Sequence, residues 1–523
     1  MNFTPAPHIT QNWHLEKPGA SGRRGMVVSQ SKNAAEAGVA VLDAGGNAID
    51  AAVATALALA AVEPWNSGLG GIGHAVVHRA GEGRAETVDF GPAAPAALDP
   101  SRFRLTGRVA SDLFGWPEVE GDTNIHGPLS FVIPSAVAGY AEMHGRWGKL
   151  PLAEIAAPAI ALAKRGLPQD WYTTLKVANS AAILRRYPES ARIYLPDGLP
   201  PVAPYQGALS CFRLGRLPET LERLSRAGWR DFYEGEIASR IVSDVRDMGG
   251  VLSADDLRDC KARVSAATEV PWRGRMLQLS GPLTAAPTAA DVLRQMEGAR
   301  FGSEPDAAWY VTLARALKAA YARRLSSLGD AEPQAAESCT THITVADADG
   351  TMVALTTTLL SSMGSRVVLP ATGILMNNGV MWFDPSPGKP NSIAPGKRPL
   401  TNMFPIVLRE GATPLIAAGA SGGRRIMAAV LQLMSFVADF RMTPERAAHQ
   451  PRIDVSSPGL VTADRKLAPE IIAALQADGP VEVVEHGVLP LNFACPNLIL
   501  ASGGTRDGIS DAASPWSAAV AQA

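Results

Sequence analysis

Two runs of β-branched residues, 340–346 and 351–358, carry the side chains best suited to chemistry in this chain. They flank a four-residue Asp-Ala-Asp-Gly turn, and alternating runs around such a turn predict a β-hairpin. With this turn length, Thr340 is expected opposite Thr357 and beside Thr358. A hydroxyl at the head of one strand would then meet hydroxyls at the end of the next. Threonine also simply suits strands, so the pattern alone leaves a purely structural role open.

The segment before Thr340 strengthens the chemical interpretation. Residues 330–339 are short, polar and acidic and contain a proline, which predicts an exposed flexible segment. A peptide bond between such a segment and a buried strand can be attacked by the next side chain. Cleavage just before Thr340 would free an α-amine with an ordinary pKa of about 7.7–8.0, which suits a base near neutrality. One residue would hold both nucleophile and base, and Thr358 could orient its hydroxyl.

A glycine turn offers the second part of such a site. Residues 414–420 predict a strand, Ser421-Gly422-Gly423 a turn, and Ile426 the start of a helix. Glycines let a backbone approach a substrate closely. Amides at this turn could stabilise an oxyanion, which is typically worth about 2.7–4 kcal/mol per donor. The same junction is also common packing geometry.

Composition argues against several other classes of protein. The chain has 48 Lys and Arg residues against 50 Asp and Glu, a net charge of -2, and so offers no field for nucleic acid or membranes. Its four cysteines form no CxxC pair and its nine histidines no HExxH spacing, so no metal site is indicated. The apolar stretch 48–62 is too short to span a bilayer, and residues 1–25 lack the apolar region of a secretory signal. A cytoplasmic location is expected.

The elements that must position these residues show no clear linker, so one large layered unit is expected. Residues 151–330 are mainly helical, and the chain after 340 is rich in strands with one long apolar helix, 426–440. Before them, the pattern predicts a strand at 25–29, helices at 34–44 and 48–62, a glycine-rich loop at 66–73, and paired strands at 74–79 and 86–90. The 48–62 helix is apolar on nearly every face and is expected to be buried.

Together these segments resemble the gamma-glutamyltransferase family of N-terminal-nucleophile hydrolases, from Gly25 to about Ala512. The resemblance is carried by GMVVSQSKNAAEAGVAVLDAGGNAIDAAVATALAL at 25–59, EPWNSGLGGIGH at 63–74, TTHITVADADGTMVALTTTL at 340–359, GILMNN at 373–378, PGKRPLTNM at 395–403 and ASGGRRI at 420–426.

The resemblance implies an α+β protein with a stacked αββα fold. It implies autocatalytic cleavage between Cys339 and Thr340 into a helix-rich large chain, 1–339, and a strand-rich small chain, 340–523, which share one core as a heterodimer. Whether two such heterodimers pair is left open. The family pattern places the nucleophile on Thr340 and the orienting hydroxyl on Thr358. It places the oxyanion amides on Gly422 and Gly423, and it implies a small-molecule amide substrate and no metal or organic cofactor.

The positions that would hold a glutamyl head depart from the family pattern. Gly91 stands where an arginine is usual, Leu360 replaces an asparagine, and Trp382 replaces an aspartate. The usual paired serines become Thr401 and Asn402. Unpaired substrate charges would be costly to desolvate beside Leu360 and Trp382, so the acylase-like members of the family are favoured. Arg424 either pairs with a carboxylate of a differently placed acyl group or makes a structural ion pair.

Other interpretations stay open. The chain could be a genuine gamma-glutamyltranspeptidase or glutathione hydrolase, or an unprocessed homologue that binds without catalysis. Cys339 could be the nucleophile if cleavage fell one residue earlier. His342, expected on the same face as Thr340, is assigned a structural role, and Lys397-Arg398 either anchors a pocket loop or is a solvated basic pair.

Overall fold

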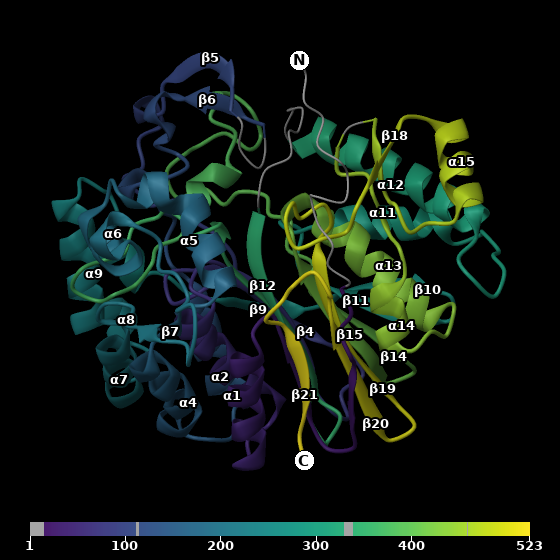
Figure 1. Cartoon of the computed structure of the whole chain (residues 1–523), viewed down its shortest axis with the longest axis horizontal. Coiled ribbons are helices and arrows are strands. Elements are labelled where there is room, and N and C mark those ends of the chain that lie inside the picture. The colour runs from purple at the N-terminus through teal and green to yellow at the C-terminus, as the bar shows by residue number, and fades with distance from the viewer. Residues whose placement is uncertain (1–14, 111–114, 329–337, 458) are drawn as a thin grey trace.

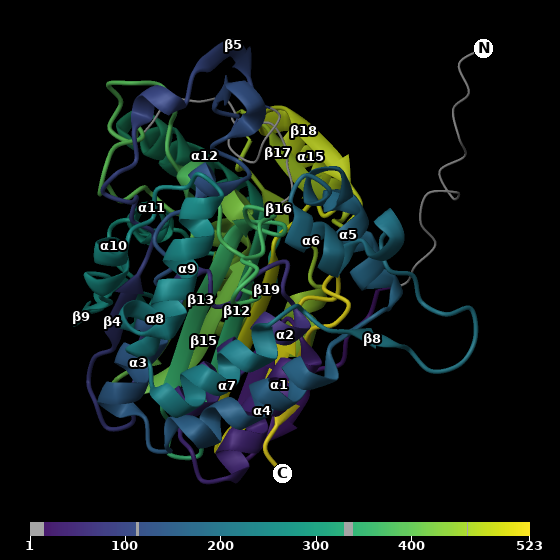
Figure 2. The same cartoon turned by 90° about the vertical axis from the view of Figure 1, so that its left-hand side faces the viewer.

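Two seven-stranded sheets lie face to face at the centre of the computed structural model, with helices on both outer sides (Figures 1 and 2). The structure describes residues 15–110, 115–328, 338–457 and 459–523, without the side chains of 325–328 and 338–339. Most of the segment predicted to be flexible, 330–339, lies outside the described residues. The layers therefore follow the order helix, sheet, sheet, helix, as the resemblance implies.

The strands of each sheet come from distant parts of the sequence. The first sheet runs in the order β21 (Ala518–Ala521), β2 (Met26–Ser29), β12 (Ser338–Ala346), β13 (Met352–Ser361), β3 (Ile72–His78), β4 (Glu86–Phe90) and β9 (Arg263–Ala266). The second runs in the order β1 (Ala20–Gly22), β20 (Thr505–Ser510), β19 (Cys495–Ser502), β15 (Thr413–Ser421), β14 (Ile406–Glu410), β11 (Arg275–Leu279) and β10 (Thr268–Trp272). Smaller sheets are formed by β5 (Leu105–Val109) with β6 (Pro117–Val119), by β7 (Leu167–Pro168) with β8 (Cys211–Phe212), and by β16 (Ile453–Asp454), β17 (Val461–Asp464) and β18 (Val481–Val484).

The helices divide between the two outer sides (Figure 1). On the side of the first sheet lie α1 (Lys32–Asp43), α2 (Ala48–Val62), α3 (Ala136–Trp147), α4 (Leu152–Arg165), α5 (Trp171–Leu184), α6 (Pro188–Tyr194), α7 (Leu217–Ala227), α8 (Asp231–Glu234), α9 (Glu236–Asp247) and α10 (Ala254–Arg258). On the side of the second lie α11 (Ala286–Met296), α12 (Ala307–Leu328), α13 (Ile426–Ala438), α14 (Pro444–His449) and α15 (Pro469–Asp478). Within the described residues, no helix combines the length and apolarity needed to cross a membrane.

Helix α2 supports the hairpin of β12 and β13 along its length. Every residue of α2 is buried, as its uniformly apolar sequence predicts, and a capping box of Asn47 and Asp50 starts it. The first amide of the helix, on Ala48, donates to Asp347 Oδ2 in the hairpin turn at 3.0 Å. At the other end, Glu63 accepts a hydrogen bond from Thr341 on β12. A helix of this length spans about 22 Å, close to the length of strand between those two contacts.

The hairpin register differs by one residue from the sequence-based prediction. Ala346 pairs with Met352, and Thr341, not Thr340, pairs with Thr357. The turn is one residue longer because Asp347 closes it: its Oδ1 accepts from the amides of Gly350 and Thr351. An irregularity between Cys339 and Thr341 leaves Thr340 beside Thr358. The Thr340 hydroxyl therefore lies beside that of Thr358, as predicted, whereas the predicted pairing of Thr340 with Thr357 is wrong.

Several element boundaries also differ from expectation. Helix α1 starts at Lys32 rather than at residue 34, and α13 ends at Ala438 rather than at residue 440. The predicted pairing of β3 with β4 is confirmed. Helix ends are set by local capping, which sequence patterns resolve only to a few residues.

The two sheets meet closely where His342 lies against Gly419. A Cβ atom on Gly419 would lie 2.2 Å from His342 Cε1. Beside this contact, Asn497 on β19 donates to the His342 carbonyl at 2.7 Å and accepts from the Thr344 hydroxyl. The glycine therefore allows the spacing that lets β12 bond to the second sheet.

We expect Gly419→Ala to destabilise the fold by about 1–3 kcal/mol, because the added methyl group forces the imidazole or a strand to move. The measurement is the thermal unfolding midpoint. Gly145→Ala is the matched control, since Gly145 is exposed on α3 with open space around it and alanine favours a helix. Equal midpoints for Gly419→Ala and the wild type would contradict the close contact.

Candidate active site

The hydroxyl groups of Thr340 and Thr358 form the centre of the candidate site. Thr340 Oγ1 lies 3.3 Å from Thr358 Oγ1, across the pair β12 and β13. Both side chains are buried, with Thr340 5% exposed. The amide of Leu360 donates to Thr358 Oγ1 at 2.8 Å. The backbone thus orients the Thr358 hydroxyl, which in turn contacts that of Thr340.

Leu360 holds this arrangement through a strained backbone. Its φ of 89° lies in the left-handed region, which typically costs a residue with a side chain about 1–3 kcal/mol. This conformation directs the Leu360 amide to Thr358. It also places the leucine side chain in an apolar cluster with Ile72, Val132 and Trp382. The turn that follows is braced by Arg366, whose Nη1 donates to Ser361 Oγ at 2.7 Å.

A buried carboxyl lies on the opposite face of β12. Thr341 Oγ1 donates to Glu63 Oε2 at 2.6 Å, and Asn66 Nδ2 donates to Glu63 Oε1 at 2.7 Å. Burial raises the pKa of Glu63 to about 7, although the two hydrogen bonds and the charge of Lys176 lower it. Sequence analysis missed this residue. The available signal was one acidic residue at the end of a uniformly apolar helix.

The glycine turn stands at the end of β15, where the short helical turn η7 (Gly423–Arg425) contacts β12. Gly422 and Gly423 have φ values of 133° and 58°, which favour glycine, and a Cβ atom on Gly422 would lie 2.6 Å from Ala494 Cα. The side chain of Gln30, at the end of β2, donates to the Ser421 hydroxyl. Helix α13 begins at Ile426, so its partial positive end lies at this turn.

The residues predicted to bind substrate come from several separate segments of the chain. Leu360 and Trp382, which ends the turn η6 (Gly379–Trp382), belong to the same buried apolar cluster. Gly91 lines a cavity of about 240 Å³ together with Asp89 and Arg398, and Ala94, which belongs to the apolar cluster, also lines it. Arg398 pairs with Asp89, and although burial raises the pKa of Asp89, His74 and Arg398 hold it at about 2.

A second group is organised by Arg324 on α12. Its guanidinium donates to the Thr401 carbonyl at 2.7 Å and to Asn402 Oδ1 at 3.2 Å. The Thr401 hydroxyl donates to the Leu283 carbonyl at 3.0 Å. The Arg424 carbonyl accepts from the Tyr321 hydroxyl on the same helix. Thr401, Asn402 and Arg424 are therefore held from α12, the helix that precedes the proposed cleavage site.

Two further hypotheses can be compared with the contacts. Burial lowers the pKa of His342 to about 3, and its Nδ1 lies 2.9 Å from Thr356 Oγ1, so the imidazole is neutral and fits the structural role. Lys397 Nζ donates to the Ser392 carbonyl at 2.9 Å, and Arg398 pairs with Asp89. These contacts favour the anchoring role of the basic pair. In the part of the chain that is described, no group of three or more His, Cys, Asp or Glu side chains is placed to hold a metal ion.

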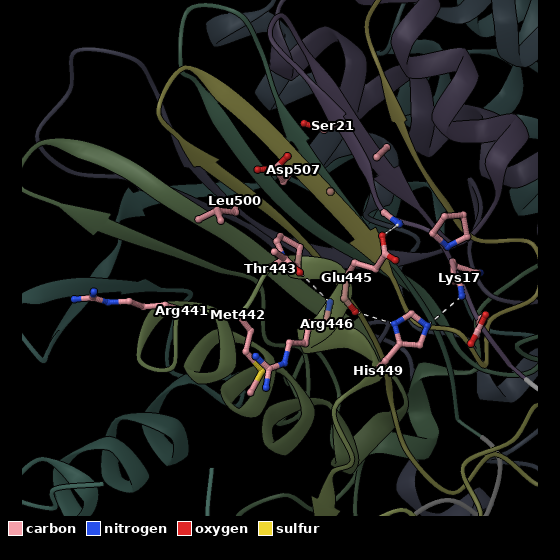
Figure 3. Close-up of a pocket in the computed structure, with 16 residues that line it drawn as sticks. Lys17, Ser21, Arg441, Met442, Thr443, Glu445, Arg446, His449, Leu500 and Asp507 are labelled. Atoms are coloured by element: carbon pink, nitrogen blue, oxygen red, sulfur yellow. Dashed lines mark hydrogen bonds between the residues drawn. The ribbon is translucent and has the colours of Figure 1, made fainter. Parts of the chain in front are cut away.

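A cavity of about 950 Å³ lies away from the two hydroxyls, between the segment 16–21 and α14 (Figure 3). Thr340, Thr358, Gly422 and Gly423 are not among its lining residues. His449 Nδ1 lies 2.8 Å from the Glu445 carbonyl oxygen, and His449 Nε2 accepts from the Lys17 amide at 3.1 Å. The hydroxyl of Thr443 caps α14. These contacts join the segment to the helix.

The fold is the αββα sandwich of the N-terminal-nucleophile hydrolases. A solved structure of a cephalosporin acylase from Bacillus halodurans superposes with a TM-score of 0.83 over 100% of this chain and 99% of that one, at 24% sequence identity. The model of the family Gamma-glutamyltranspeptidase matches residues 34–338 and 331–514. The chain therefore belongs to the gamma-glutamyltranspeptidase family and is an enzyme of its amide-hydrolysing and acyl-transferring type.

An acylase and a glutathione hydrolase are both similar to the chain over most of its length. The Acylase ACY 1 proenzyme of Pseudomonas sp. (strain SE83) is 30% identical over 91% of this chain and 90% of its own. The Glutathione hydrolase proenzyme of Escherichia coli (strain K12) is 28% identical over 87% of this chain and 85% of its own. Both are described as proenzymes.

We expect Thr358→Val to slow turnover about tenfold or more, because it removes the hydroxyl that contacts Thr340 while keeping the side-chain volume. Thr357→Val is the matched control. Its hydroxyl is equally buried but faces Tyr140, 2.9 Å away, on the other side of the strand. The measurements are kcat and the unfolding midpoint of each variant. A similar loss of kcat in both variants would point to general damage to the strand.

Proposed function

We propose that the chain is a precursor that cleaves itself between Cys339 and Thr340. It then hydrolyses or transfers an amide-linked acyl group through an acyl-Thr340 intermediate. The observation that carries the proposal is the contact of the Thr340 and Thr358 hydroxyls at the head of β12. Membership of a family with proenzymes of both acylases and glutathione hydrolases supports it.

In the first step, Thr340 Oγ1 attacks the carbonyl carbon of Cys339. A C–O bond forms, the C–N bond breaks, and the hydroxyl proton ends on the nitrogen of Thr340, which becomes an amine. Water then cleaves the ester, leaving a carboxylate on Cys339 and a free hydroxyl on Thr340. Thr358 would orient the attacking oxygen, as its position beside Thr340 suggests.

The two products, 1–339 and 340–523, would stay together without a covalent link. In the first sheet, β12 pairs with β2 and β13 pairs with β3, so both strands of the hairpin bond to strands of the large chain. The C-terminal strand β21 also pairs with β2. These ladders support a heterodimer that shares one core. The pairing of two heterodimers and a cytoplasmic location remain predictions.

In turnover, the α-amine of Thr340 would take the hydroxyl proton as Thr340 Oγ1 attacks the substrate carbonyl. The oxyanion that forms would be stabilised by the amides of Gly422 and Gly423. The C–N bond breaks, the leaving amine takes the proton, and the acyl group remains on Thr340. Water or an acceptor amine then attacks the ester and restores the free hydroxyl.

We favour an acyl group without the charged head of a glutamyl residue. Leu360 and Trp382 pack together in an apolar cluster, and the Thr401 hydroxyl is taken by the Leu283 carbonyl. A zwitterionic head would lose hydration there without gaining partners. Arg424 near the glycine turn could pair with a carboxylate in another part of the acyl group. The acylase relatives support this substrate class.

We expect the purified wild type to mature into two fragments, the smaller one beginning at Thr340, and Thr340→Ala to remain one chain without turnover. Denaturing gels and intact mass of each protein measure this. Thr413→Ala, at the exposed first position of β15, serves as the control for loss of a threonine outside the site and should still be cleaved. A wild type that stays in one piece and is inert towards amides would favour the non-catalytic binding protein instead.

A substrate panel separates the two enzymatic hypotheses. We expect glutaryl, oxamate-like and other simple acyl amides to exceed a γ-glutamyl anilide in kcat/KM by about tenfold or more, since one poorly paired buried polar group already costs that much. The measurement is initial rate against concentration for each amide. Dominant turnover of the γ-glutamyl compound would identify a gamma-glutamyltranspeptidase or glutathione hydrolase.

A further inference from the structure

The carboxyl group of Glu63 lies in an environment that folding alone does not explain. It follows the last residue of α2 and is 2% exposed. The carbonyl end of a helix disfavours a negative charge, and burial disfavours any charge. The last two turns of α2 are apolar, so the helix could be followed by an apolar residue at lower cost. Costly buried groups of this kind concentrate at functional sites.

Glu63 is connected to the nucleophile strand by short contacts. Its Oε2 accepts from Thr341 Oγ1 at 2.6 Å, and Ser67 Oγ donates to the same hydroxyl at 3.3 Å. Thr341 is the residue directly after Thr340. Glu63 therefore sits one residue from the nucleophile, on the face of β12 opposite the second sheet.

The loop after Glu63 also holds the neighbouring strand. The Asn66 carbonyl accepts from the Leu359 amide, and the Trp65 carbonyl accepts from the Met363 amide, both at 2.9 Å. Leu359 follows Thr358 directly. The segment that begins with Glu63 thus contacts the strand residues next to both hydroxyls.

The charges around this strand are unequal on its two faces. The charge of Lys176 on α5 lowers the pKa of Glu63, against the larger effect of burial. On the other face, η7 brings Arg424 and Arg425 into the neighbourhood of β12, while His342 is buried and neutral. Of these groups, Glu63 has a hydrogen bond to the residue next to Thr340, and its carboxyl is the acidic group that this network brings to the head of β12.

We propose that Glu63 is a positioning residue for Thr340: through the hydroxyl of Thr341 it fixes the nucleophile strand, and its carboxylate charge sets the proton affinity of the α-amine. This inference rests on the proposed self-cleavage, because the α-amine exists only after it. A nearby carboxylate stabilises the ammonium form, so it keeps the amine protonated to a higher pH.

The test is the pH dependence of kcat/KM for Glu63→Gln, measured between pH 5 and 9 on the most active amide of the panel. Removal of the negative charge should move the acid limb to lower pH by about one unit, with both fragments still formed. Asp439→Asn is the matched control. Asp439 is also a buried carboxyl at a helix C-cap, where burial raises its pKa, but it lies at the far end of α13. Its profile should match the wild type.

Thr341→Val separates position from charge, since it removes the linking hydroxyl and keeps the carboxyl. We expect it to lower the plateau of kcat/KM about tenfold while the acid limb moves much less than in Glu63→Gln. If Glu63→Gln does not fold, this variant still tests the link, and a plateau equal to that of the wild type would overturn it. An unchanged acid limb in folded, cleaved Glu63→Gln would overturn the role of the charge. A wild type that neither splits nor turns over would instead remove the proposed function itself.

Stability against pH provides an independent readout in the uncut Thr340→Ala background. Burial raises the pKa of Glu63 from 4.5 to about 7, so between these values the folded chain binds more protons at this site than the unfolded chain. The stabilisation that Glu63 contributes to the folded state is therefore present at low pH and is lost as the pH rises from 4.5 to about 7. Adding Glu63→Gln should remove that part of the decline in unfolding midpoint between pH 5 and 8. An identical decline in both proteins would contradict the burial of the charge.

Discussion

The pairing of β12 with β13 is the constraint on which the candidate site depends. It brings Thr340 Oγ1 to 3.3 Å from Thr358 Oγ1, although the two residues are eighteen positions apart. The register is set at the far end of the hairpin, where Asp347 closes the turn and also accepts from the first amide of α2. Because side chains alternate along a strand, a slip of one residue would turn the hydroxyl to the opposite face.

The layered fold brings the glycine turn of the second sheet to the hairpin of the first sheet. The glycine turn belongs to the second sheet, and stacked sheets lie about 10 Å apart, so small residues are needed where the sheets must approach. Gly419 allows His342 to fill the interface, and Asn497 ties β12 to β19 beside it. The Gln30 side chain reaches from the end of β2 to Ser421 at the head of the turn. Both sheets are thus fixed relative to one another at the site.

Two energetically unfavourable features lie next to Thr340, the proposed nucleophile. Leu360 adopts a left-handed backbone so that its amide can orient Thr358, and Glu63 keeps a carboxyl in the core beside Thr341. Leucine rarely adopts a positive φ, and a glutamate side chain is rarely buried. Departures of this kind are expected where structure is constrained by function, because packing elsewhere can offset them.

The sequence by itself determined the elements and the chemistry that short-range patterns encode. Alternation and turn residues predicted the hairpin, the glycine pair predicted the turn, uniform apolarity predicted a buried α2, and ordered motifs indicated the family and the αββα fold. The hairpin register was wrong by one residue, because a side chain, Asp347, lengthens the turn.

Only the tertiary structure decided which distant groups meet. It brought Glu63 to Thr341, Arg324 to Thr401, and Leu360 to Trp382. Contacts between Glu63 and Thr341 span 278 positions of chain. Such contacts follow from how whole layers pack, since burial, hydrogen bonding and charge act between neighbours in space, whatever their separation along the chain.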